Sequence, residues 1–184
     1  MTHALSNLSA RGSMLTHFTR ASITASALDN LMTILSEGRI RGGSRMVLGG
    51  QPVVCFCDAP LAELRHMLVR ANRRRYEPFG LAVDRRFAFQ AGARPALYMS
   101  TDEAEQIIDA EEMWRVVTLD LERDPPVDWT YEREWRLAGD LTLPGNGPVA
   151  LVENWKDADE LYDHFNGNPP CAGVIPLSEL LGSA

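Results

Sequence analysis

Short apolar runs of strand length outnumber the helical patterns in this chain and do not alternate regularly with them. The clearest run, Val53–Cys57, is continuous and apolar, which is typical of a buried strand. The clearest helical pattern lies within residues 22–38, where apolar residues recur at helical spacing before Gly38, a plausible helix terminator. A doubly wound parallel sheet requires strands and helices to alternate. The pattern therefore predicts an α+β fold.

The other expected elements follow from the same combination of apolar patterns and turn signals. Further strands are predicted at residues 14–19, 79–83, 95–99, 114–121, 131–137, 150–152 and 173–176. Further helices are predicted at residues 60–68, 101–112 and 156–165. The short segment that joins the second and third of these strands contains Gly92, and we expect it to be rich in turns.

Length and charge limit the class of protein. The 184 residues, of which 45% are hydrophobic, suffice for one substantial core, so we expect a loose leader over residues 1–13 and a single domain over 14–184. A net charge of −7 argues against broad neutralisation of phosphates, and the basic cluster at residues 70–75 is local. No run approaches the roughly 20 apolar residues that a membrane span needs. We therefore expect a soluble, cytoplasmic protein with no membrane contact, for which nucleic acid is a less favoured partner.

Metal sites and the common catalytic motifs lack their residues. Three cysteines, Cys55, Cys57 and Cys171, cannot form a fully paired framework, and one Cys-x-Cys is weak evidence for zinc. The chain contains no Gly-x-Ser-x-Gly, His-Glu-x-x-His or Gly-x-Gly-x-x-Gly motif. We therefore predict no metal site and small, buried cysteines in a reducing compartment.

The segment Tyr131–Leu137 concentrates charge inside a predicted strand. Because side chains alternate between the faces of a strand, Glu132, Glu134 and Arg136 are expected to share one face. Two carboxylates on one face can stabilise a cationic transition state or hold a ribose hydroxyl. The alternative is a solvated edge strand whose charges pair with each other and contribute little.

Three other side chains give weaker signals. His17 and Thr19, at the end of an apolar strand, can offer an imidazole and a backbone amide to a ribose, although a lone histidine is more often a hydrogen-bonded core residue. Tyr98 can stack on a planar ring, yet core packing is the usual role of an aromatic residue in a strand. Only the combination of these residues with the charged strand points to a site.

The order of several motifs resembles that of the AbiGi-type abortive phage-resistance proteins. The segments that carry this resemblance are Leu15–Thr19, Ile34–Ile40, Val54–Leu61, Tyr76–Val83 and Arg94–Tyr98. The later segment Trp129–Arg136 is also similar to a neighbouring family of uncharacterised bacterial proteins. Together these motifs cover roughly residues 14–140, which is most of the expected domain.

These proteins in turn resemble distant members of the ADP-ribosyltransferase fold. That resemblance implies a split, mixed β-sheet with flanking helices, which grips NAD. It also implies that Glu134 is the catalytic glutamate at the start of a late strand, with Glu132 as the upstream member of a Glu-x-Glu pair. The residues that it places against NAD are His17, Thr19, Phe56 and Tyr98.

The function implied by the resemblance is that of an NAD-dependent, ADP-ribosyltransferase-like protein of phage defence or of a toxin–antitoxin pair. Its partner would be a macromolecular acceptor of ADP-ribose. The alternative is a catalytically inactive antitoxin or immunity-type module on the same fold, which binds a cognate partner protein. A third reading makes nucleic acid the acceptor, with residues 70–75 as the contact surface.

Overall fold

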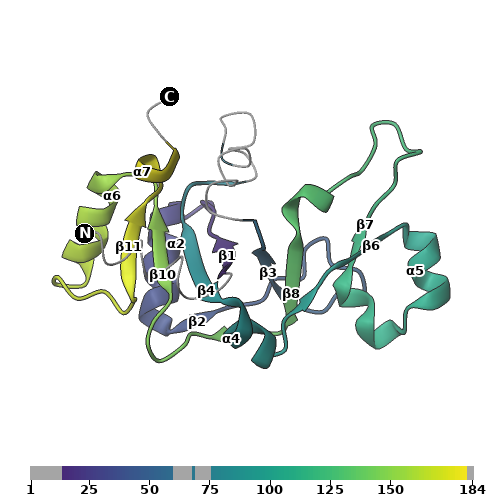
Figure 1. Ribbon diagram of the computed structural model, residues 1–184, viewed down its shortest axis with the longest axis horizontal. Helices are drawn as coiled ribbons and strands as arrows, with labels where there is room; N and C mark the ends of the chain where they lie inside the picture. The colour runs from purple at the N-terminus through teal and green to yellow at the C-terminus, as the bar shows by residue number, and fades with distance from the viewer. Residues whose placement is uncertain (1–13, 60–67, 69–75, 182–184) are drawn as a thin grey trace.

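The computed structural model describes residues 14–59, 68 and 76–181 of the chain. Its main sheet contains β1 (Met14–Phe18), β3 (Val53–Cys57), β4 (Gly80–Asp84), β5 (Arg94–Pro95), β8 (Glu134–Ala138), β10 (Val149–Val152) and β11 (Gly173–Pro176). Within the described residues these strands lie in the order β11-β10-β4-β1-β3-β8-β5 (Figure 1). The pair β10–β11 is parallel and the other neighbours are antiparallel. The sheet is therefore mixed, as predicted.

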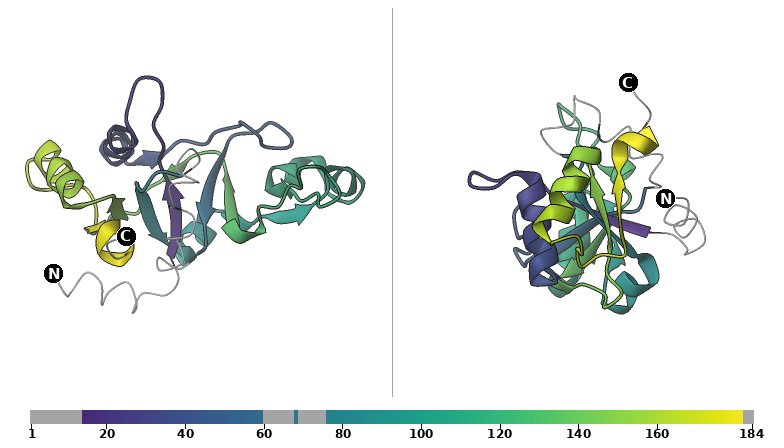
Figure 2. Two further views of the ribbon diagram at one scale, coloured as in Figure 1. Left: turned by 90° about the horizontal axis from the view of Figure 1, so that it is seen from above. Right: turned by 90° about the vertical axis from the view of Figure 1, so that its left-hand side faces the viewer.

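The two faces of the sheet are covered differently. Helices α2 (Ala27–Glu37) and α6 (Trp155–His164) lie side by side over one face (Figure 2). That face contributes the larger core cluster, whose sheet members are Leu15, Val54, Phe56, Leu81, Val83, Leu137, Ala150 and Val152. The opposite face carries a smaller cluster, which includes Cys57, Ala82, Leu151, Ile175 and Leu177, the first residue of α7 (Leu177–Leu181).

The predicted helix within residues 22–38 is present as α2, which begins at Ala27. Ser26 caps its N-terminus, because the Ser26 side chain accepts a hydrogen bond from the backbone of Asp29 and the Asp29 side chain accepts one from the backbone of Ser26. Gly38 ends the helix in the left-handed conformation, at φ 62°, which favours glycine. The capping box explains why the helix starts at Ala27, the first residue of its apolar pattern, and not at residue 22.

Most of the remaining predictions hold. The strands predicted at 14–19, 53–57, 79–83, 150–152 and 173–176 are confirmed to within one residue at each end, and the helix predicted at 156–165 is α6. The helix predicted at 101–112 is divided into α5 (Thr101–Ile107) and a 3-10 segment, η2 (Ala110–Arg115). Two short strands not predicted, β2 (Arg39–Ile40) and β9 (Leu141–Thr142), pair with each other.

The strand predicted at residues 95–99 is wrong as a single strand. Pro95 ends β5, which pairs with β8, whereas β6 (Leu97–Met99) pairs in parallel with β7 (Val116–Thr118). At the change of partner, the backbone N–H of Ala96 still donates to the carbonyl of Glu134, at 2.8 Å. Together α5, η2, β6 and β7 form a lobe beside the β5 end of the sheet (Figure 1).

The turn-rich segment predicted before β5 is confirmed only at residues 91–92, which include Gly92, because a helix, α4 (Arg85–Gln90), occupies the rest of it. Asp84 caps this helix by accepting a hydrogen bond from the backbone of Phe87, and Ala88 is fully buried. The expected leader at residues 1–13 and the expected helix at residues 60–68, apart from Leu68, lie outside the described residues. No helix in the described part of the chain has the length and apolar character needed to cross a membrane.

Candidate functional site

The charged segment does not form one continuous strand. Residues Thr130–Glu132 form a 3-10 turn, η3, and Arg133 adopts a left-handed conformation with φ 46°, so that β8 begins only at Glu134. The prediction that Glu132 shares a strand face with Glu134 and Arg136 is therefore wrong. The turn places Glu132 before the strand and leaves Glu134 as the first strand residue.

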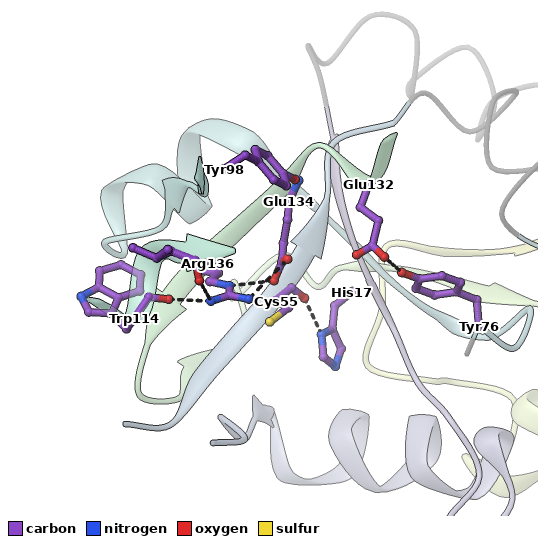
Figure 3. Close-up of polar contacts among 9 residues, drawn as sticks. His17, Cys55, Tyr76, Tyr98, Trp114, Glu132, Glu134 and Arg136 are labelled. Carbon is purple, nitrogen blue, oxygen red and sulfur yellow. Dashed lines mark hydrogen bonds and ion pairs between the residues drawn. The ribbon is translucent and has the colours of Figure 1, made fainter. Parts of the chain in front are cut away.

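Glu134 and Arg136 lie on one face of β8, as the alternation predicted, and form a buried ion pair. Arg136 Nε lies 2.8 Å from Glu134 Oε1, and Nη2 lies 3.5 Å from Oε2 (Figure 3). The two side chains are only 7% and 9% exposed. The alternative of a solvated edge strand is wrong, because this pair is buried and β8 lies between β3 and β5.

The lobe of α5, η2, β6 and β7 also forms hydrogen bonds with Glu134 and Arg136. Arg136 Nη1 donates to the carbonyl oxygens of Trp114 and Val116, at 2.9 and 2.8 Å. The backbone N–H of Glu134 donates to the Tyr98 hydroxyl, at 2.7 Å (Figure 3). Burial raises the pKa of Tyr98 to about 12, so this hydroxyl stays neutral at physiological pH.

Strand β3 completes the surroundings of Glu134. The register places Cys57 opposite Glu134 and Cys55 opposite Arg136. Burial, followed by the nearby Glu134 charge, raises the pKa of Cys55, so its thiol stays protonated beside Glu134. Burial likewise raises the pKa of Cys57 to about 11. Neither cysteine is thus in the thiolate form that a nucleophile requires.

Glu132 is buried at a neighbouring position. The Tyr76 hydroxyl donates a hydrogen bond to the Glu132 carboxylate (Figure 3). The Tyr76 ring meets the edge of Phe18 on β1, with ring centroids 5.9 Å apart. The two glutamates therefore have different surroundings, since Glu134 faces Arg136 and Glu132 faces the Tyr76 ring system.

His17 and Phe56 lie on the opposite face of the sheet from Glu134. Thr16 pairs with Cys57, which pairs with Glu134, and the next residue along β1 points the other way. There the His17 ring meets Phe56, with centroids 6.1 Å apart, and Phe56 is only 2% exposed in the main core. The structure thus gives Phe56 no exposed ring for stacking.

Thr19 is also buried, and both its side chain and its backbone form hydrogen bonds within the fold. It is 4% exposed, and its hydroxyl donates to the carbonyl of Ala27 at 2.9 Å, at the start of α2. Its backbone N–H donates to the carbonyl of Phe79. Of the residues predicted to contact NAD, the structure therefore brings Tyr98 to Glu134 and places His17, Phe56 and Thr19 among supporting contacts; their contact with NAD stays a prediction.

Strands β1 and β3 are loosely joined beside Glu134. They share one paired position, Thr16 with Cys57, whereas β1 and β4 share five. The Nδ1 atom of His17 contacts the carbonyl of Cys55 at 2.9 Å (Figure 3). An imidazole thus satisfies a carbonyl on β3 that a closer partner strand would otherwise use.

Stability at acidic pH tests the environment of His17. Burial lowers the pKa of His17, and the contact with the Cys55 carbonyl opposes that shift. Below about pH 6.5 the unfolded chain therefore binds a proton at this histidine that the folded chain does not bind. The free energy of unfolding thus decreases as the pH is lowered, by at most about 1.4 kcal/mol per pH unit. His17→Gln is expected to reduce this slope in urea unfolding between about pH 7.5 and 5. The exposed His164→Gln is the control, and equal slopes in all three proteins would contradict the assignment.

Two residues of this site were missed as site residues. Arg136 was placed on the correct face, but its contact with the lobe depends on a fold that brings residues 114–116 to β8. Tyr76 gave no local signal, because its partner is 56 residues away. A pocket of about 320 Å³ lies elsewhere, between the loops at residues 143–147 and 168–171, and none of the predicted site residues lines it.

The Glu134 carboxylate has acceptor positions that its contacts with Arg136 do not use. A carboxylate offers about four acceptor positions. Arg136 uses two of them, which leaves about two. Among the described residues no group of three or more His, Cys, Asp or Glu side chains could hold a metal ion.

Comparison of the chain with models of protein families, with curated protein sequences and with solved structures found no match.

Proposed function

We propose that this chain is an ADP-ribosyltransferase-like protein of phage defence or of a toxin–antitoxin pair, which acts in the cytoplasm with NAD as donor and Glu134 as its key carboxylate. The observation that carries the proposal is the buried Glu134 carboxylate at the first residue of a late strand, fixed by Arg136 and with an acceptor position left. Glu134 also lies beside the junction of β1 and β3, which share a single paired position in one continuous sheet.

The chemistry requires such a group. When the bond between the ribose and nicotinamide of NAD breaks, positive charge develops on the sugar. A carboxylate that accepts a hydrogen bond from a ribose hydroxyl stabilises that charge, most strongly in a site shielded from water. Glu134 is 8% exposed and is held in one orientation, which suits this role. Glu132, in the turn before the strand, is proposed to orient the acceptor.

The proposed site lies on the Glu134 face of the sheet, with Tyr98 at its border. In the proposal, three other residues support this site without lining it: His17, Thr19 and Phe56. His17 contacts the carbonyl of Cys55, and Phe56 packs in the main core. Thr19 donates a hydrogen bond to the carbonyl of Ala27 at the start of α2. Their substitution is therefore expected to change stability before it changes contact with NAD.

The second candidate is an inactive antitoxin or immunity-type module that binds a partner protein. The observation in its favour is that Arg136 contacts both oxygens of Glu134 and offsets its charge. This candidate predicts no turnover of NAD. Residues 70–75, the contact surface for a nucleic acid acceptor, lie outside the described residues, and salt-sensitive binding to single strands would support that acceptor.

The experiment incubates the purified protein with a cell extract and NAD labelled in the adenine ring. The protein, nucleic acid and small-molecule fractions are counted for label, and released nicotinamide is measured in parallel. We expect label in a macromolecular fraction together with free nicotinamide. Absence of both, with a correctly folded protein, would reject the transferase and favour the inactive module.

A further inference from the structure

The Arg136 guanidinium is fixed independently of Glu134. It has five N–H groups, of which two from Nη1 go to the carbonyls of Trp114 and Val116. Both of these residues are buried, at 7% and 1% exposed, and they join η2 to β7. The guanidinium is thus anchored to the backbone of the lobe before it contacts the carboxylate.

The remaining contacts of Arg136 define the plane of the Glu134 carboxylate. Nε and Nη2 approach the two different oxygens, at 2.8 and 3.5 Å. Two contacts from one rigid, planar group restrict rotation of a carboxylate, whereas one contact does not. The Tyr98 hydroxyl fixes the same residue at its backbone N–H. The lobe therefore holds Glu134 at both its side chain and its backbone.

We propose that Arg136 is a positioning residue, which sets the orientation in which Glu134 accepts the ribose hydroxyl of NAD. This inference rests on the proposed function and adds the means by which the lobe controls its key carboxylate. Arg136 does not contact the substrate in this arrangement. Misplacement of a catalytic group by about 1 Å can slow a reaction about 100-fold. Loss of the two contacts by which Arg136 orients the Glu134 carboxylate is therefore expected to lower the reaction rate measurably.

Arg136→Lys separates positioning from charge. Lysine keeps the positive charge that a buried carboxylate needs, but its ammonium cannot contact both oxygens in one plane while it donates to two carbonyls. We expect the rate of nicotinamide release per folded molecule to fall roughly 10- to 100-fold, with the KM for NAD changed less than about twofold. A crystal structure of the variant is expected to show the Glu134 carboxylate rotated from its present plane.

The control is Arg115→Lys, which makes the same change in η2, where Arg115 pairs with Glu112 at the surface and does not contact Glu134. Its rate and KM are expected to equal those of the wild type. An Arg136→Lys protein with wild-type turnover, or with an unchanged Glu134 carboxylate in the crystal, would overturn the positioning role while leaving the proposed function intact. Failure of the wild type itself to release nicotinamide would instead reject the proposed function, and the positioning role with it.

Discussion

Replacing Glu134 with glutamine is expected to slow the release of nicotinamide from NAD by about 100- to 1,000-fold, the range seen when one electrostatic contact to a transition state is lost. Glutamine keeps the shape of the side chain and an oxygen for Arg136, but it removes the negative charge that faces the developing cation. Binding of NAD is expected to change little, because the charge develops only as the bond breaks. Single-turnover measurement of nicotinamide, with calorimetry for binding, separates the two effects.

Glu112→Gln is the matched control for this substitution. Glu112 also pairs with an arginine, Arg115, but its side chain is 49% exposed. We expect this variant to release nicotinamide at the wild-type rate. If Glu134→Gln and Glu112→Gln were equally active, Glu134 would have no role in the chemistry.

Replacing Glu134 with alanine is expected to lower the free energy of unfolding by about 3–5 kcal/mol, because Arg136 would be left buried without its carboxylate. Glu112→Ala, at the exposed pair, is expected to cost less than about 1 kcal/mol. Urea unfolding at constant pH gives both values. Equal losses at the two sites would contradict a buried ion pair at Glu134.

A double-mutant cycle extends this test. Glu134→Ala combined with Arg136→Met removes both charges, so the loss is expected to be smaller than the sum of the two single losses. Some destabilisation will remain, because the carbonyls of Trp114 and Val116 lose their donor. Strict additivity would show that the two side chains do not interact.

Local patterns were enough for the elements that are stabilised locally. The apolar run Val53–Cys57 is a buried strand, and α2 forms between its own caps, Ser26 and Gly38. The predictions that failed concern segments whose structure depends on residues far away in the sequence. The segment predicted as one strand at residues 95–99 changes its pairing partner from β8 to β7 at Ala96. The helix α4 is too short for its apolar periodicity to be recognised in the sequence.

The candidate site was predicted only in part for the same reason. Alternation along β8 placed Glu134 and Arg136 together, but the left-handed Arg133, which separates Glu132 from the strand, has no local signature. The face on which His17 lies depends on the pairing of Thr16 with Cys57, residues 41 positions apart in the sequence, and a shift of one residue would reverse it.

The position of a bound NAD analogue tests most directly whether Glu134 is the carboxylate of an NAD site. A crystal structure with an analogue that resists cleavage is expected to show a hydroxyl of the nicotinamide ribose at about 2.6–3.2 Å from a Glu134 oxygen, on the face of the sheet that carries Cys57. An analogue bound instead around His17 and Phe56, on the face covered by α2, would contradict that assignment, as would the absence of binding by calorimetry at millimolar NAD.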